Sequence, residues 1–379
     1  MTTLEELGLL KMDFLGLRTL TVIQNAVLLA RRKQPELNIN QIDYNDQKVL
    51  DYIGTGKTDG VFQLESAGMK FMKELKPHNL EDVIAGISLY RPGPMDFIPQ
   101  YIRGKNDSSS ITYDCPQLEP ILAPPTYGCI VYQEQVMQIV RDLAGYSLGR
   151  SDLLRRAMSK KKAAVMEKER KIFIYGDEET GVPGCIKNGI DEQTANKIYD
   201  EMIDFAKYAF NKSHAAAYAV VSYQTAWLKY YFPVEYMAAL MTSVIDNPSK
   251  VSEYIYACRQ MNIKILPPDI NKGEANFSVD GGGDIRYGLA AIKSIGRPVI
   301  KAIVEDREEL GLFQNLEDFI TRLSAKNILN KRTIENLIKA GGIGYAWRNK
   351  KTVHEYLCTD RRSCNSRKKE LYGWADDIV

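Results

Sequence analysis

The densest group of charged residues in the sequence lies between residues 141 and 171, and most of its members are basic. Ten Lys or Arg residues lie there against four Asp or Glu, in a chain whose total formal charge is +2. Ser151 is a favoured N-cap residue, so we predict a helix from Ser151 to about residue 175. One face of that helix would present several cations to a single anion, and a phosphate group is the obvious candidate. These cations are Arg155, Arg156 and Lys160. A solvated basic helix face would give the same pattern.

A second candidate is the start of the apolar stretch at residues 210–231. Ser213 is suited to cap a helix there, which would leave backbone N–H groups and the side chains of Lys212 and His214 at the helix start. Such an arrangement favours phosphate, and His214 can donate a hydrogen bond or a proton. A capped, buried helix with a packed histidine explains the same residues equally well.

Lys11 and Asp13 form a third candidate, within the short apolar run of residues 7–17. We predict a strand for this run and a helix for residues 18–33, which places Asp13 late on the strand. The chain has only three His, and they are scattered, so metal chemistry would rest on carboxylates and on a hard ion such as Mg²⁺. One carboxylate cannot hold two ions, and taken alone Asp13 fits an ordinary turn residue better.

Residues 289–303 predict a helix, a tight glycine turn and a second helix. Such a hairpin can direct backbone N–H groups at a DNA phosphate without reading base sequence, although a simple helical hairpin has the same pattern. The loop GTGKTDG at residues 54–60 lacks the spacing of a phosphate-binding P-loop, which disfavours a P-loop phosphotransferase.

These elements belong to a chain of 379 residues that is 45% hydrophobic and 26% charged, which excludes disordered and disulfide-scaffold classes. Short strands are predicted around residues 276–279 and 285–287, and helices elsewhere. The expected fold is therefore mainly α with small β elements (α+β), in several domains. No window is apolar enough for a membrane span, and six irregularly spaced Cys fit reduced thiols, so we expect a cytoplasmic protein.

Eight segments, in this order, resemble the bacterial replicative DNA polymerases of family C, the polymerase III alpha subunits. Their number and order make the resemblance specific over about residues 4–342. The segments are KMDFLGLRTL (11–20), DGVFQLESAGMK (59–70), LYRPGPM (89–95), YGCIVYQEQVMQI (127–139), GYSLGRSDLLRRAMSKKK (145–162), FNKSHAAAYAVVSYQTAWLKYYFPVEYMAAL (210–240), PPDINKGEANF (267–277) and IRYGLAAIKSIG (285–296).

The resemblance implies a division of the chain into four parts. Residues 1–35 would be the C-terminal end of the palm, and residues 36–268 the fingers domain. Residues 269–342 would be a helix-hairpin-helix region that grips duplex DNA. Family sequence stops after this region, and a shift of reading frame restores it, so we interpret residues 343–379 as a frameshifted tail.

The resemblance also implies roles for individual residues. Asp13 would be a catalytic aspartate and a Mg²⁺ ligand, with Lys11 close to the incoming triphosphate. The residues expected to bind the nucleotide are Arg155, Arg156, Lys160, Lys212, His214 and, as a weaker candidate, Arg91. The residues expected to bind DNA are Lys293, Ser294, Gly296 and Arg297.

The implied activity is two-metal addition of deoxynucleotides to a primer 3′ end. The implied partners are primer–template DNA, deoxynucleoside triphosphates, and the sliding clamp and other replisome subunits. The family's paired aspartates are absent, so we expect a fragment that is inactive alone. The alternative is a non-catalytic DNA-binding or scaffold module built on the hairpin region.

Overall fold

The computed structural model describes residues 7–10, 12, 14–159, 163–206, 210–326 and 328–343. Helices dominate these residues, and their one sheet has three strands of two residues each, so the predicted fold class is confirmed. The chain divides into two compact units. Unit 1 combines Met1–Ile39 with Tyr231–Val379, and unit 2 is Asn40–Tyr230. The domain boundaries expected from the resemblance stay predictions.

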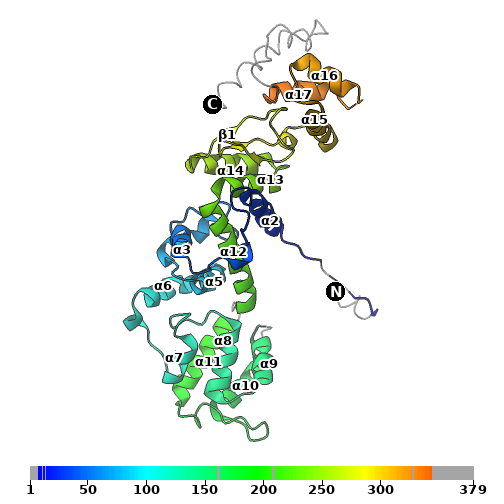
Figure 1. Ribbon diagram of the computed structural model, residues 1–379. Coiled ribbons are helices and arrows are strands. Elements are labelled where there is room, and N and C mark those ends of the chain that lie inside the picture. Colours follow the sequence, from blue (N-terminus) through cyan, green and yellow to red (C-terminus); the bar gives the residue numbers. More distant parts are fainter. Residues whose placement is uncertain are drawn as a thin grey trace, which may run out of the picture. The chain divides into compact units, whose positions relative to one another are not determined.

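Unit 1 contains a helix pair formed by α2 (Arg18–Ala30) and α13 (Pro233–Ser243), which pack against each other (Figure 1). Apolar side chains of α2 recur every three or four residues and face inward, as the amphipathic pattern of residues 18–33 predicts. An ion pair of 2.6 Å joins Lys33 Nζ to the buried carboxylate of Glu235. Helix α14 (Pro248–Gln260) follows and is capped by the side chain of Asn247.

The strand predicted for residues 7–17 is not formed in the described part of this segment, which has neither strand nor helix. Most of its described apolar side chains are exposed, and Phe14 and Leu15 have 90% and 94% of their surface accessible to solvent. A strand needs a neighbour for its backbone hydrogen bonds, and the described residues provide none here. Lys11 and Asp13 lie outside the described residues.

The small sheet of unit 1 has the strand order β1-β3-β2, with β3 parallel to β1 and antiparallel to β2. A turn at Gly283, whose φ is +85°, joins the antiparallel pair. The two strands predicted here are confirmed. The strands are β1 (Ile265–Leu266), β2 (Ser278–Val279) and β3 (Ile285–Arg286).

The last part of unit 1 packs three helices around an apolar core that includes Phe313, Phe319 and Leu337. Asp306 is fully buried in it, and its carboxylate accepts from Arg322 Nε at 2.7 Å and pairs with Lys326 Nζ at 2.8 Å. Such a buried charge is tolerated only when it is paired. The helices are α15 (Arg297–Leu310), α16 (Leu316–Ser324) and α17 (Lys331–Lys339).

The first helix predicted for the hairpin at residues 289–303 is wrong, because only a single 3-10 turn forms, at Leu289–Ala291. The backbone N–H groups of Leu289 and Ala290 donate to the carbonyls of Glu274 and Ala275 at 2.9 and 3.0 Å. After this turn Ile292 has an extended backbone conformation, so no helix continues. The second predicted helix is α15.

Among the described residues of unit 2 the regular elements are α-helices and short 3-10 helices, with two isolated β-bridges. Two buried clusters organise it, and the start of α8 contributes to both, because Tyr132 belongs to one and Val136 to the other. Its helices are α3 (Gln47–Gly54), α4 (Met72–Leu75), α5 (Leu80–Leu89), α6 (Ile98–Asn106), α7 (Glu119–Leu122), α8 (Gln133–Ala144), α9 (Leu148–Ser159), α10 (Ala163–Tyr175), α11 (Glu192–Ala206) and α12 (Lys212–Tyr231).

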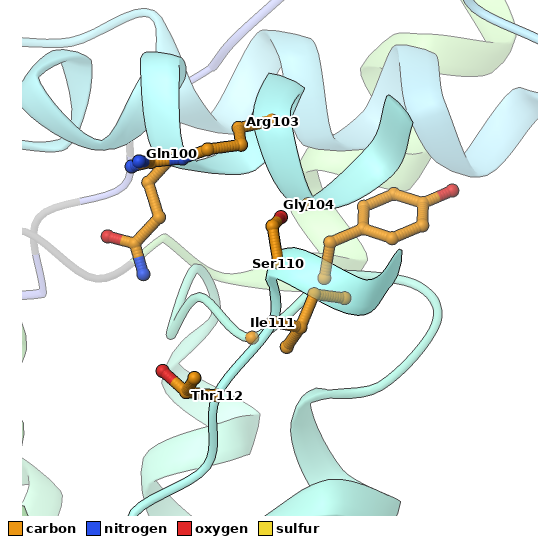
Figure 2. A pocket seen from close by; sticks show the side chains of 8 residues that line it. Gln100, Arg103, Gly104, Ser110, Ile111 and Thr112 are labelled. Carbon is orange, nitrogen blue, oxygen red and sulfur yellow. The ribbon is translucent and has the colours of Figure 1, made fainter. Parts of the chain in front are cut away.

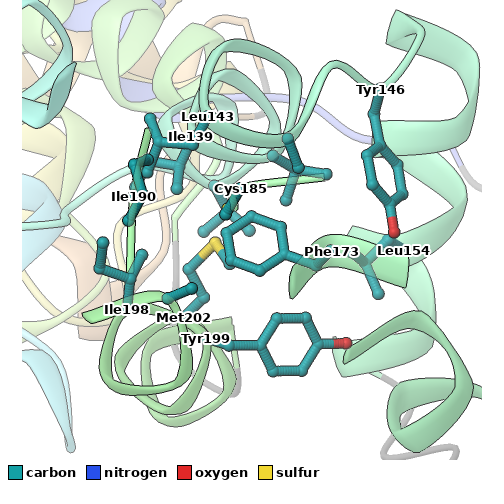
Figure 3. Close-up of a cluster of buried hydrophobic side chains, with 14 of the residues drawn as sticks. Ile139, Leu143, Tyr146, Leu154, Phe173, Cys185, Ile190, Ile198, Tyr199 and Met202 are labelled. Carbon is teal, nitrogen blue, oxygen red and sulfur yellow. The ribbon is translucent and has the colours of Figure 1, made fainter. Parts of the chain in front are cut away.

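One cluster joins α8, α9, α10 and α11, whose inward side chains meet as Figure 3 shows. Phe173 and Tyr199 are fully buried in it, with ring centroids 5.4 Å apart. The other cluster packs α3, α4, α5 and α6 against the small residues on one side of α12, including Ala215, Ala219 and Ala226. Small side chains allow this close approach.

Both predicted N-caps were wrong by a few residues. Helix α9 begins before Ser151, and Ser147 is the capping residue, since its Oγ accepts from the N–H of Arg150 at 3.3 Å. Ser151 is buried within the helix, where its hydroxyl donates to the Ser147 carbonyl at 3.0 Å. The described residues of the helix predicted over 151–175 are helical, in α9 up to Ser159 and in α10 from Ala163 to Tyr175, and residues 160–162 lie outside the described part.

At α12 the cap is Asn211 rather than Ser213. The Asn211 side chain accepts from the N–H of His214 at 2.9 Å, so Ser213 lies inside the first turn. Ser, Asn and Asp supply the same capping chemistry, and tertiary contacts at Asn211 select it.

Candidate phosphate-binding site

The starts of α8 and α12 lie side by side in unit 2. The N–H of Gln133 donates to the carbonyl of Phe210 at 2.9 Å, and the N–H of Phe210 donates to the carbonyl of Val131 at 3.3 Å. These bonds form a short parallel bridge between Tyr132 and Phe210. Two helix N-termini, each with a partial positive charge, are thereby fixed next to each other.

Polar side chains surround the first turn of α12. The Glu134 carboxylate accepts from the N–H of Lys212 at 3.1 and 3.0 Å and from Asn211 Nδ2 at 3.0 Å. Lys212 Nζ lies 3.0 Å from a carboxylate oxygen of Glu81 and 5.3 Å from the ring centroid of Tyr132. The cation at this helix start is therefore oriented by one acid and one aromatic ring.

Aromatic rings contact two more of the side chains predicted to bind nucleotide, His214 and Arg91. His214 lies between Phe210 and Tyr218, with ring centroids at 5.4 and 4.2 Å. The guanidinium carbon of Arg91 is 4.6 Å from the centroid of the Phe210 ring. Phe210 therefore links Arg91 to the start of α12 through a cation–π contact.

Helix α9 carries two arginines, and both pair with the carboxylate of Asp152. Arg155 donates from Nε and Nη2 to one oxygen of Asp152, at 3.0 and 2.7 Å, and from Nη1 to Gln133 Oε1 at 3.0 Å. Arg156 Nε lies 2.8 Å from the other oxygen of Asp152. The hydrogen bond to Gln133 therefore connects α9 to the start of α8. The hydrogen bonds from Arg155 also lower the pKa of Asp152 below its usual value.

Five of the residues predicted to bind nucleotide thus belong to one connected set of contacts, which we call the cation cluster. All of it lies in unit 2. Lys160, Lys11 and Asp13 lie outside the described residues, so the structure does not place them. The cation cluster consists of Arg91, Arg155, Arg156, Lys212 and His214.

Sequence reasoning missed the residues that connect these cations, although they stand in the segment YGCIVYQEQVMQI. Gln133 accepts from Arg155, and Glu134 accepts from the start of α12. Gln135 caps its own helix, since its Oε1 accepts from the N–H groups of Val131 and Tyr132 at 2.8 and 2.9 Å. Three consecutive amide or acid side chains at a helix start were the available signal.

The four residues predicted to bind DNA lie together at the start of α15 in unit 1, and all are exposed. Gly296 is the N-cap and offers no side-chain cap, and Pro298, which has no N–H, follows at the second helical position. The N–H of Val299 donates to the Gly296 carbonyl at 3.0 Å. The Lys293 carbonyl accepts from Asn336 Nδ2 at 3.0 Å, which holds the turn against α17. Ser294 has a positive φ of 63°. The four are Lys293, Ser294, Gly296 and Arg297.

Two other features are separate from the cation cluster. A polar pocket of about 210 Å³ lies between α6 and the segment after it, lined by Gln100, Arg103 and Thr112 among others (Figure 2). The loop GTGKTDG has a structural role, because the buried ammonium of Lys229 donates to the carbonyls of Lys57 and Asp59 at 3.1 and 2.6 Å.

Within the described residues, no three His, Cys, Asp or Glu side chains gather as a metal site. No helix there is long and apolar enough to cross a bilayer.

Two family models match the chain. Residues 19–181 match the finger domain of the bacterial DNA polymerase III alpha subunit, and residues 262–353 match a helix-hairpin-helix motif. The mainly helical fold and these two matches define the class of protein as one with a polymerase finger region followed in sequence by a helix-hairpin-helix region. The chain belongs to the family of bacterial DNA polymerase III alpha subunits.

Curated relatives named DNA polymerase III subunit alpha are similar to nearly the whole chain. The one from Thermus aquaticus is 47% identical over 349 residues, which are 90% of this chain and 28% of the relative. The one from Escherichia coli (strain K12) is 47% identical over 89% of this chain and 29% of its own length. The one from Bacillus subtilis (strain 168) is 44% identical over 93% of this chain and 31% of its own. The chain therefore spans less than a third of each relative.

Proposed function

We propose that this chain supplies the triphosphate-binding and DNA-gripping parts of a DNA polymerase that extends a primer 3′ end. The observation that carries the proposal is the cation cluster, in which α9 and the start of α12 are tied through Gln133 and Phe210. Guanidinium and ammonium groups held on rigid helices suit the oxygens of a polyphosphate. The relatives' names support the reaction class.

In the proposed reaction the primer 3′-hydroxyl attacks the α-phosphorus of a deoxynucleoside triphosphate in line, and pyrophosphate leaves. Arg155 and Lys212 offset the negative charge on the β- and γ-phosphates. His214 donates a hydrogen bond to the leaving pyrophosphate. Removing one such donor typically lowers the rate by about 10²- to 10³-fold.

The metal site is proposed at Asp13, which would be one ligand of a Mg²⁺ pair. We propose that further carboxylates complete it, because one carboxylate cannot hold two ions. Bound Mg²⁺ would neutralise phosphate charge during the transfer. We accordingly propose that the chain alone does not extend a primer, and that the sliding clamp and other replisome subunits act on the longer protein.

Nucleotide binding by the 379-residue chain tests the proposal. Affinity for deoxyadenosine triphosphate should fall by at least about tenfold in Arg155→Ala and in His214→Ala, because each removes a charged or polar phosphate contact. Arg141→Ala is the matched control, since Arg141 is an exposed cation at the far end of α8, paired with Asp142 at 2.6 Å. Equal affinity in all four proteins would refute the proposal.

A non-catalytic DNA-binding module is the second candidate, favoured by the helix-hairpin-helix match and the exposed cations at the start of α15. Duplex binding without any triphosphate binding would support this module over the polymerase.

A further inference from the structure

Asp152 holds two cations of the cluster at once. It lies one helical turn before Arg155 and Arg156, so its two carboxylate oxygens reach one guanidinium each, at 2.7 and 2.8 Å. A carboxylate and a phosphate compete for the same donors on a guanidinium, because both offer paired oxygens at similar spacing. The cluster thus contains its own counter-ion.

The two arginines are held differently. Arg155 has 18% of its side chain exposed, and Gln133 fixes it from a second helix in addition to Asp152. Arg156 has 62% of its side chain exposed and reaches Asp152 from its own helix at the i,i+4 position. An exposed ion pair of this kind is weak and is easily exchanged. Arg156 is therefore the guanidinium that can leave Asp152 at low cost.

We propose that Asp152 is a positioning residue. It pairs with Arg156 until a polyphosphate binds, and Arg156 then leaves Asp152 and contacts the phosphate, while Arg155 keeps its hydrogen bond to Gln133. The inference rests on the proposed function. It adds a specificity device, because a ligand must outcompete a carboxylate to recruit Arg156. A triphosphate, with more charge than a monophosphate, does so more effectively.

Removing the competitor should strengthen triphosphate binding. In Asp152→Asn we expect affinity for deoxyadenosine triphosphate about two- to fivefold tighter than in the unchanged chain, the range set by the strength of an exposed ion pair. Affinity for deoxyadenosine monophosphate should rise less. Isothermal titration calorimetry on the 379-residue chain, at one fixed salt concentration, measures both.

Two further variants isolate the mechanism. Arg156→Ala should bind the triphosphate more weakly, and adding Asp152→Asn to it should give no gain, because Arg156 is gone and Arg155 is still fixed by Gln133. Asp142→Asn is the matched control for charge. It also removes one exposed, arginine-paired carboxylate, on α8, and should leave the affinity unchanged.

The outcomes separate the inference from the proposed function. Triphosphate binding that is lost in His214→Ala but unchanged or weakened in Asp152→Asn overturns only the inference. A gain that persists without Arg156, or that Asp142→Asn reproduces, overturns it as well. An unchanged chain that binds no triphosphate, or binding that survives His214→Ala, overturns both. Circular dichroism of each variant confirms that the helices are intact.

Discussion

Glu134, in the first turn of α8, accepts the backbone N–H of Lys212, which lies 78 residues further along the chain at the first position of α12. Both carboxylate oxygens take part, at 3.1 and 3.0 Å. One acid therefore caps a helix to which it does not belong. The contact sets the spacing between two helix starts, on which the geometry of the cation cluster depends.

Glu134→Ala should therefore loosen the start of α12. Loss of a charged cap costs about 1 to 2 kcal/mol of stability, and the cost should be local. Hydrogen exchange measured on peptides should show faster exchange in residues 212–216, with little change in α3. Glu134→Gln keeps a carbonyl acceptor and should have the smaller effect. Equal exchange in all three proteins would show that Glu134 does not hold the helix.

The ion pair between Lys105 and Asp82 is the most deeply buried one in the fingers part of the described chain. Its atoms Nζ and Oδ2 are 2.9 Å apart, and the two side chains are 4% and 2% exposed. Lys105→Met leaves Asp82 buried without its counter-ion, so unfolding should need about 3 to 5 kcal/mol less free energy. Urea titration followed by circular dichroism measures the change.

Lys197→Met is the control for that measurement. Lys197 pairs with Asp114, but its side chain is 60% exposed. Its loss should cost less than about 1 kcal/mol, because exposed ion pairs contribute little. Similar losses in the two variants would mean that burial does not determine the strength of the Lys105 pair.

Stability should fall at alkaline pH because several buried groups resist ionisation. Burial raises the pKa of the Cys129 and Cys185 thiols to about 12, and raises the pKa of Tyr101 and Tyr199 well above the ordinary value. In the unfolded chain, the pKa of a thiol is about 8.5 and that of a tyrosine is about 10. Between those values and the folded pKa, only the unfolded chain releases the protons, so rising pH favours unfolding.

The stabilisation is thus fully present below about pH 8.5 and is lost progressively toward about pH 12 and above. Tyrosinate absorbance and far-ultraviolet circular dichroism, recorded together during the titration, test this. A group of tyrosines should ionise only as helical signal disappears. Ionisation of every tyrosine with the helices intact would contradict the prediction.

Much of the fold was predictable from local pattern. The apolar spacing of residues 18–33 marked α2, because a buried helix face repeats every three to four residues. Caps were harder, since Ser147 and Ser151 have the same chemistry, and the choice between them depends on where the chain enters the helix. The 3-10 turn at Leu289 could not be predicted, because its hydrogen bonds go to residues 274 and 275.

The sequence indicates which basic residues to consider for the candidate site, but not the contacts that link them to one another. Residue type and helical spacing single out Arg155 and Arg156. The roles of Gln133 and Glu134 depend on the bridge from Tyr132 to Phe210, which joins segments far apart in the sequence. Local periodicity carries no information on such pairings.

The start of α15 should bind DNA through its phosphates. Lys293 and Arg297 are exposed there, beside the N-terminus of a 14-residue helix. Their combined replacement by Ala should weaken duplex binding irrespective of base sequence, because phosphate contacts carry no sequence information. The slope of log affinity against log salt should decrease in magnitude by about 1.8, since each phosphate that a cation neutralises contributes about 0.9. Electrophoretic mobility or fluorescence anisotropy at several salt concentrations measures it.

The matched control removes two cations from another helix of unit 1. Lys250 and Arg259 lie on α14, outside the residues that match the helix-hairpin-helix motif. Their replacement by Ala changes the net charge by the same amount, so a purely long-range effect of charge would weaken binding equally in both double variants. A salt slope that changes only in the Lys293 and Arg297 variant assigns the phosphate contacts to the start of α15. Equal slopes in the two variants would place the DNA elsewhere on the protein.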